Sequence, residues 1–162
     1  MLRDLFIKET DQWSEKPNKA NVVTSTQTLP KARPIKKILL IDDDPIFGRI
    51  FLKMAQSKGK EVAYCESIDS LGNLNAQEFD VAIVDYDLGH VTGVELASYI
   101  EKFALSPMPI VLVSQSHRNL AGEGSQDICK FIHKSQGHEA IIEAAVLAAQ
   151  KWQASNTVTK ED

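Results

Sequence analysis

Five short apolar runs that alternate with helical segments constrain this chain more than any other feature of its sequence. The runs have the length and residue types of buried strands, and they lie at 37–41, 61–65, 79–85, 109–114 and 129–134. Apolar residues at helical spacing follow four of these runs, at 45–55, 67–74, 93–103 and 138–152. Strands that alternate with helices form a parallel sheet with both faces covered. The sequence therefore predicts an α/β fold with a doubly wound, five-stranded parallel sheet in the order 2-1-3-4-5.

Residue types that start and stop helices support the first helical segments. Asp44 before Pro45 places a capping carboxylate and a fixed φ angle at the start of the segment 45–55. Gly59 is predicted to end that helix, and Ser67 is predicted to cap the next one.

The compact part of the chain is predicted to span residues 36–152, with a tail on each side. Residues 1–35 have the composition of a largely flexible arm and linker, although 1–13 would also suit a short amphipathic helix. Residues 153–162 are polar and are predicted to be disordered. Because only ten residues follow Trp152, we expect a stand-alone, single-domain protein.

Composition excludes several classes of partner. The net charge is −4 and 43% of residues are hydrophobic, so we expect neither nucleic acid nor an anionic membrane as a main partner. No apolar stretch approaches the roughly 18 residues of a membrane span, and the N-terminus lacks the pattern of a signal peptide. Cys65 and Cys129 lie in apolar runs and are predicted to be buried free thiols in a reducing compartment. The sequence therefore predicts a cytoplasmic protein without membrane insertion.

Charged and polar residues follow the predicted strands at the point where each strand ends. Asp42 and Asp43 follow the first strand, Asp85 ends the third, Ser114 the fourth and Lys134 the fifth. Each acid taken alone could simply start a turn. Together they converge on the edge of the sheet where doubly wound folds place their sites. Carboxylates crowded in this way suit Mg²⁺, beside which an aspartate can attack a phosphoryl group.

The stretches ILLIDDDP, VDYDLGHVTG, VLVSQS and FIHK resemble the receiver domain of two-component response regulators. The resemblance covers about residues 36–152 and implies the flavodoxin-like receiver fold. It implies that Asp85 accepts a phosphoryl group from a histidine kinase or a phosphotransfer protein. It also implies that Asp42 and Asp43 bind Mg²⁺, with the backbone carbonyl of Asp87 as a further ligand.

The same resemblance implies how a phosphorylated protein would signal. Ser114 matches the hydroxyl residue of the family's switch, Phe131 its aromatic residue, and Lys134 the lysine of the phosphorylation site. The response would be read by another protein through direct contact. The Asp87 side chain is expected to affect hydrolysis of the acyl phosphate, since its charge would lie near the incoming water.

Three segments depart from the family pattern. Gly89 stands where proline is frequent, so a looser loop is expected after Asp85. Ser135 follows Lys134 where proline is usual, so a trans peptide bond and a slightly different loop are expected there. Gly122 and Gly124 interrupt the region of the fourth helix, which is predicted to be short or mobile.

Two other functions remain open at this point. A receiver-like adaptor would keep the fold and bind its partner without phosphate. A phosphatase of the haloacid dehalogenase type would use DYDLG as a D-x-D motif, although that family usually has a longer chain. We expect no enzyme activity beyond self-phosphorylation and dephosphorylation at Asp85.

Overall fold

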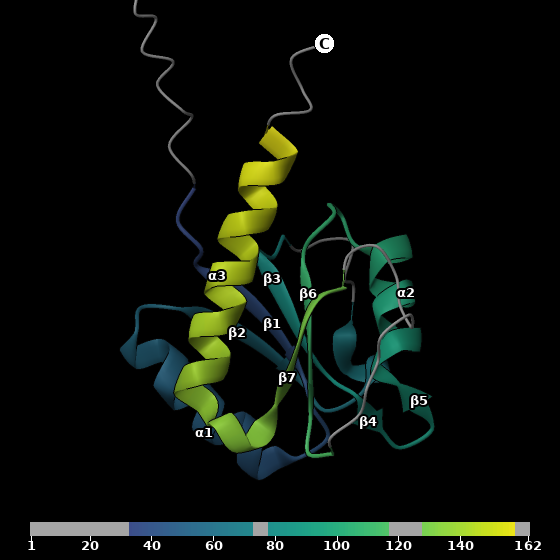
Figure 1. Cartoon of the computed structure of the whole chain (residues 1–162). Coiled ribbons are helices and arrows are strands. Elements are labelled where there is room, and N and C mark those ends of the chain that lie inside the picture. Colours follow the sequence, from purple (N-terminus) through teal and green to yellow (C-terminus); the bar gives the residue numbers. More distant parts are fainter. Residues whose placement is uncertain (1–32, 73–77, 117–127, 158–162) are drawn as a thin grey trace, which may run out of the picture.

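A five-stranded parallel sheet forms the centre of the fold (Figure 1). The computed structural model of the chain describes residues 33–72, 78–116 and 128–157. In sheet order the strands are β2 (Glu61–Cys65), β1 (Lys37–Ile41), β3 (Val81–Asp85), β6 (Ile110–Ser114) and β7 (Ile128–His133). All neighbouring pairs are parallel. Because β6 and β7 are the fourth and fifth strands of this sheet along the chain, the predicted order 2-1-3-4-5 is confirmed.

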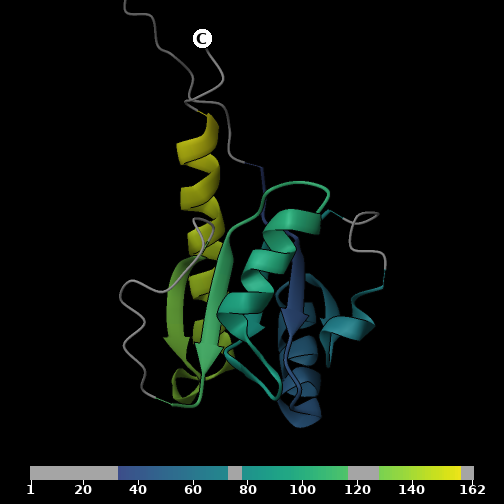
Figure 2. The same ribbon diagram turned by 90° about the vertical axis from the view of Figure 1, so that its right-hand side faces the viewer.

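Helices cover both faces of the sheet, as Figures 1 and 2 show from two directions. One face carries α1 (Pro45–Ser57) and α3 (His138–Thr157), and the other carries α2 (Gly93–Phe103) and the 3₁₀ helix η1 (Ile68–Leu71). All five residues of β3 are buried, and successive residues join opposite cores. The near-continuous apolar run that ends at Asp85 is therefore the expected sequence of a central strand covered on both sides.

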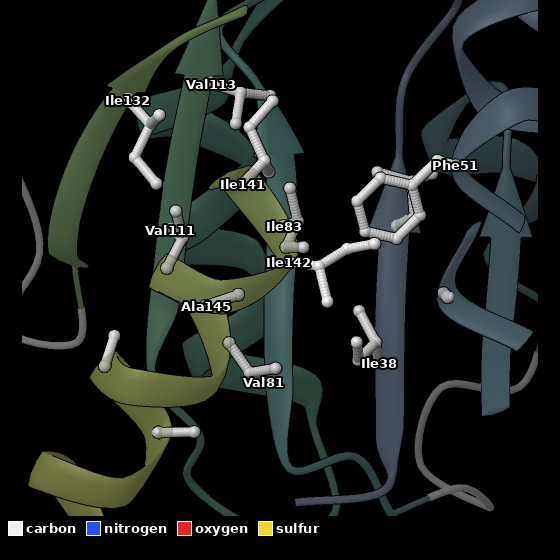
Figure 3. Packing of buried hydrophobic residues seen from close by; sticks show 14 of the residues in the cluster. Ile38, Phe51, Val81, Ile83, Val111, Val113, Ile132, Ile141, Ile142 and Ala145 are labelled. Atoms are coloured by element: carbon white, nitrogen blue, oxygen red, sulfur yellow. The ribbon is translucent and has the colours of Figure 1, made fainter. Parts of the chain in front are cut away.

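The core beneath α1 and α3 is built from large side chains that interlock across the sheet. Phe51 of α1 and Ile142 of α3 lie over Ile38 and Ile83 (Figure 3). Phe51, Ile38 and Ile83 are all fully buried. Burying one such side chain stabilises the fold by about 1.5–3 kcal/mol, so this cluster fixes α1 firmly on β1.

The first helix begins and ends at the predicted residues. The Asp44 carboxylate accepts hydrogen bonds from the backbone N–H groups of Ile46 and Phe47, and Pro45 occupies the first helical position. Gly59, with a φ of 71°, follows the C-terminal residue Lys58 and allows the chain to turn towards β2. The acidic loop before α1 is thus joined directly to a well-capped helix.

Two of the predicted helices differ from their predicted bounds. The segment predicted as a helix from Ser67 to residue 74 forms only the single 3₁₀ turn η1 in its described part, and the Ser67 side chain makes no capping hydrogen bond. Helix α3 continues to Thr157, so the predicted disorder is wrong for residues 153–157. The alanine-rich composition of α3 favours this extension beyond the sheet.

The buried position predicted for Cys129 is wrong, whereas Cys65 is buried. The reason is an irregularity in β7, where Ile110 pairs with Ile128 and Val111 pairs with Lys130. Cys129 is the extra residue of this bulge on the edge strand, and its side chain is exposed. Neither cysteine forms a disulfide.

The compact part starts slightly before residue 36. Ile35 is 2% exposed, and Arg33 forms an ion pair of 2.8 Å with Asp80. Residues 1–32 and the predicted fourth helix at 117–127 lie outside the described residues. Among the helices within 33–72, 78–116 and 128–157, none combines the length and apolar character needed to cross a bilayer.

Replacing Phe51 tests the core beneath α1. Phe51→Ala is expected to lower the free energy of unfolding by about 3–5 kcal/mol in urea, because it removes a fully buried ring and leaves a cavity. The control is Ile50→Ala at the neighbouring residue, which is 44% exposed and should cost less than about 1 kcal/mol. Equal losses in the two variants would contradict this account of the core.

Candidate functional site

Three carboxylates meet at the carboxyl edge of the sheet. Asp42 and Asp43 directly follow β1, and Asp85 is the last residue of the adjacent strand β3. One oxygen from each of the three side chains lies within 4.8 Å of the others. Asp42 is 0% exposed and Asp85 5% exposed, whereas Asp43 is open to solvent. The predicted convergence of these three residues is therefore present in the structure.

Lys134 joins the acidic cluster from the position directly after the edge strand β7. Its Nζ lies 2.7 Å from Asp42 Oδ2 and 3.0 Å from Asp85 Oδ2, and its side chain is only 7% exposed. The ammonium also lies 4.6 Å from the centre of the Phe47 ring in α1. Lys134 thus bridges the two buried carboxylates and lies against an aromatic ring.

The charges of these side chains fit a divalent cation. Three carboxylates and one ammonium leave two negative charges in excess when all four groups are ionised. The three carboxylates lie at the ends of the neighbouring strands β1 and β3, and that of Asp43 is exposed. Carboxylate oxygens are ligands that Mg²⁺ accepts while it keeps several of its waters. Asp42, Asp43 and Asp85 are the residues that could hold such a cation.

Burial changes the acidity of the cluster. It raises the pKa of Asp85 to about 6, and the nearby Asp42 charge adds to this effect, while Lys134 opposes it. Burial also raises the pKa of Asp42, against the hydrogen bond from Lys134. For Lys134, burial lowers the pKa of the ammonium, but its hydrogen bond and charge interactions with Asp42 and Asp85 raise it by more. Lys134 therefore stays charged, and the carboxylates repel one another.

A hairpin follows Asp85 where the sequence predicted a looser loop. Strands β4 (Asp87–Leu88) and β5 (Val91–Thr92) pair as an antiparallel ribbon, which corrects that expectation. Gly89 supplies the turn with a φ of 71°, a conformation that proline could not adopt. The ribbon leads directly into α2 and gives the segment beyond Asp85 a defined path.

Gly93 at the start of α2 packs tightly against the end of β3. Its backbone N–H donates a 2.7 Å hydrogen bond to the Tyr86 carbonyl. A Cβ at this position would lie 2.7 Å from the Asp85 carbonyl oxygen and 2.9 Å from the Tyr86 Cα. Only glycine fits here, and the close contact fixes the backbone of Asp85 against α2.

Ser114 lies beside Asp87 in this structure. The Ser114 hydroxyl donates a 3.4 Å hydrogen bond to Asp87 Oδ2 and accepts one of 3.1 Å from the Ser116 backbone N–H. The Ser116 hydroxyl donates to the same Asp87 oxygen over 3.5 Å. Ser116 was not predicted as a site residue, although its position two residues after Ser114 was the available signal. The Asp87 side chain therefore contacts the two serines, while the role of its backbone carbonyl as a ligand stays a prediction.

The loop after Lys134 is held without the usual proline. Lys134–Gln136 form a short 3₁₀ turn, η3, in which His133 Nδ1 accepts a hydrogen bond of 3.1 Å from the Ser135 backbone N–H. Phe131 lies half-buried on β7 and packs against the core beneath α2. Phe131 is thus placed away from the acidic cluster, and its switch role stays a prediction.

Comparison with known proteins identifies the class of protein that this fold and site define. The family model described as the response regulator receiver domain matches residues 38–146. The chain therefore belongs to the response regulator receiver domain family.

Among curated proteins, the chain is similar to the regulatory protein VirG of Agrobacterium tumefaciens (strain 15955). The two are 29% identical over 85 residues, which make up 52% of this chain and 31% of VirG. The match thus spans about a third of that relative's length.

Solved structures share the fold at low sequence identity. A response regulator from Burkholderia pseudomallei with a phosphorylated aspartic acid, calcium ion and citrate is 21% identical, with a TM-score of 0.59 over 77% of this chain and 75% of that chain. The response regulator TrrA from Thermotoga maritima in complex with Mg²⁺–BeF is 22% identical, with a TM-score of 0.61 over 70% of this chain and 99% of that chain. A CheY-like receiver domain from Methanospirillum hungatei JF-1 is 21% identical, with a TM-score of 0.62 over 75% of this chain and 98% of that chain.

The raised pKa of Asp85 predicts how stability depends on pH. An acid whose pKa rises from 3.8 to about 6 on folding binds its proton more tightly in the folded protein, so its ionisation destabilises the fold as the pH rises through this window. Asp85→Asn, measured by urea unfolding without divalent cations, is expected to raise the free energy of unfolding by about 1–3 kcal/mol at about pH 7.5.

This gain should shrink as the pH falls from about 6 to 3.8 and approach zero only below this window, where Asp85 is protonated in both the folded and the unfolded wild type. Asp69→Asn, at an exposed acid of η1, is the control and should have little effect across this range. A gain for Asp85→Asn that does not depend on pH would show that the charge of Asp85 is not its cause.

Proposed function

We propose that this chain is a phosphoacceptor in a two-component phosphorelay. In this proposal Asp85 takes a phosphoryl group from a histidine kinase or a phosphotransfer protein, and the modified chain signals by contact with another protein. The observation that carries the proposal is the position of the Asp85 carboxylate. It lies within 4.8 Å of the Asp42 and Asp43 carboxylates and 3.0 Å from the Lys134 ammonium, at the end of a fully buried strand.

The transfer step needs a rigid carboxylate and neutralised charge. A carboxylate oxygen of Asp85 forms a bond to phosphorus while the bond from phosphorus to the donor's histidine nitrogen breaks, and the electron pair of that bond stays with the imidazole. Asp42, Asp43 and Asp85 would hold Mg²⁺, which neutralises negative charge on the carboxylates and the phosphoryl oxygens when it is bound. Lys134 is close enough to Asp85 to contact the transferred group.

The response is proposed to begin with a change of partner for Ser114. Its hydroxyl now lies 3.4 Å from Asp87 Oδ2, and the oxygens of a phosphoryl group on Asp85 would compete with that carboxylate as anionic acceptors. Phe131, half-buried beside the core under α2, is proposed to shift with it. The chain would exist in two conformations that differ in these contacts, and phosphorylation would shift the equilibrium towards one of them.

The proposal includes no further catalysis. Asp85 would be phosphorylated and dephosphorylated without turning over another substrate, in the cytoplasm and without binding nucleic acid. The phosphatase alternative finds no support in the contacts of Asp87, because its carboxylate lies against the hydroxyls of Ser114 and Ser116. If the chain were instead an adaptor that binds its partner without phosphate, Asp85→Asn would leave its affinity for the partner unchanged.

Labelling by a small phosphodonor tests the proposal. With Mg²⁺ and phosphoramidate, intact mass measurement should show one added phosphoryl group on the wild type and none on Asp85→Asn. Removal of Mg²⁺ by a chelator should also abolish labelling, because the crowded carboxylates then repel the anionic donor. Asp69→Asn serves as the matched control and should be labelled like the wild type. A wild type that stays unlabelled, or a labelled Asp85→Asn, would refute the proposal.

The Asp87 charge should slow the approach of an anionic donor. Asp87→Asn keeps an oxygen for Ser114 and Ser116 but removes one negative charge. Two unit charges about 4 Å apart in water interact by about 1 kcal/mol. The initial rate of labelling is expected to rise about two- to fivefold, and the difference should diminish as salt is added. An unchanged rate at low salt would remove this role from Asp87.

A further inference from the structure

The loop that carries Asp42, Asp43 and Asp44 is joined to β2 by one side chain. Tyr64 lies on β2 and pairs with Leu40 of β1. Its hydroxyl lies 3.0 Å from the carbonyl oxygen of Asp42 and 3.3 Å from that of Asp44. The two carbonyls flank Asp43 on either side, so a single hydroxyl contacts the backbone both before and after this residue.

Other hydrogen bonds fix parts of the same loop. The Asp42 backbone N–H donates to the Cys65 carbonyl over 3.1 Å, and the Asp44 N–H donates to Asp42 Oδ1 over 3.0 Å. These bonds hold the two N–H groups, whereas the Tyr64 hydroxyl contacts the carbonyls. The Asp43 side chain is exposed, so its direction depends on this backbone rather than on packing around it.

Gly48 provides the space that the Tyr64 ring occupies. A Cβ built on Gly48, in the first turns of α1, would lie 2.3 Å from the ring carbon Cζ and under 3 Å from both neighbouring ring carbons. The ring therefore lies directly on the helix backbone, and any side chain at position 48 would displace it together with its hydroxyl.

We propose that Tyr64, seated on Gly48, is a positioning residue that holds the backbone around Asp43 and thereby sets the cation affinity of the site. This inference rests on the proposed cation-dependent function, because it concerns the same three carboxylates. Groups that orient metal ligands typically change the affinity for the metal when they are removed. Within the part of the chain that the structure describes, the Tyr64 hydroxyl bonds to the carbonyls of Asp42 and Asp44 and not to Asp85.

Removal of the hydroxyl alone tests the inference. Tyr64→Phe keeps the ring on Gly48, and its affinity for Mg²⁺ is expected to be about three- to tenfold weaker. A titration with MgCl₂ followed by backbone amide NMR measures this affinity without any phosphorylation. The matched control is Tyr99→Phe, at a 40% exposed tyrosine on α2, which should bind Mg²⁺ like the wild type.

A second variant reaches the same hydroxyl through the helix. Gly48→Ala leaves Tyr64 intact but displaces its ring, and it should weaken Mg²⁺ binding by a similar factor. In a Tyr64→Ala background there is no ring to displace, so Gly48→Ala should then have no further effect on the affinity. Gly48→Ala in the wild-type background carries the test on its own if the variants at Tyr64 do not fold.

The outcomes separate this inference from the proposed function. If Tyr64→Phe and Gly48→Ala lose stability in urea but bind Mg²⁺ like the wild type, Tyr64 is only structural and the inference is overturned. If the wild type itself binds no Mg²⁺, the proposed cation-dependent function is refuted, and the inference that rests on it is refuted with it. Weaker binding in both variants, with the control unchanged and the Gly48→Ala effect lost in Tyr64→Ala, supports the inference.

Discussion

Repulsion among the carboxylates at the end of β1 and β3 is the constraint on which the site depends. Asp42 and Asp85 are buried beside each other, and burial makes each of them a weaker acid. Lys134 offsets part of this repulsion by bridging both groups from β7. The first, third and fifth strands of the sheet are thus coupled by charge at one edge, in addition to the backbone hydrogen bonds between neighbouring strands. A cation or a phosphoryl group that enters the cluster changes the balance of charge for all three strands together.

The two cores give this edge its rigidity. β3 contributes alternate residues to the core under α1 and α3 and to the core under α2, so it is fixed from both faces. α1 starts directly after the acidic loop, where Asp44 caps it, and Phe51 anchors it to β1. Lys134 in turn lies over the Phe47 ring of the same helix. The residues that face the cluster therefore rest on one continuous packed layer, which fits a site that must hold charged groups in place.

The sequence was sufficient to predict the sheet and the position of the charged residues. Four of the five apolar runs end on a charged or polar residue of the site or are followed directly by one, and parallel topology alone brings such ends to one edge. The features that were missed depend on relations between strands. The exposure of Cys129 follows from a bulge in the pairing of β7 with β6, and the reach of Tyr64 to the Asp42 carbonyl follows from the register of β2 on β1. The ribbon of β4 and β5 was missed because four-residue pairing leaves almost no periodicity to detect.

Gly93 packs so closely against the Asp85 carbonyl that no side chain fits at position 93, and this packing limits movement between β3 and α2. The Gly93 N–H already donates to the Tyr86 carbonyl over 2.7 Å at this junction, so β3 has little room to move towards α2 if Asp85 is phosphorylated as proposed. On the other flank, the hydroxyls of Ser114 and Ser116 contact Asp87 over 3.4 and 3.5 Å. If Asp85 is phosphorylated as proposed, the resulting movement is therefore expected on the side of β6 rather than at the junction between β3 and α2.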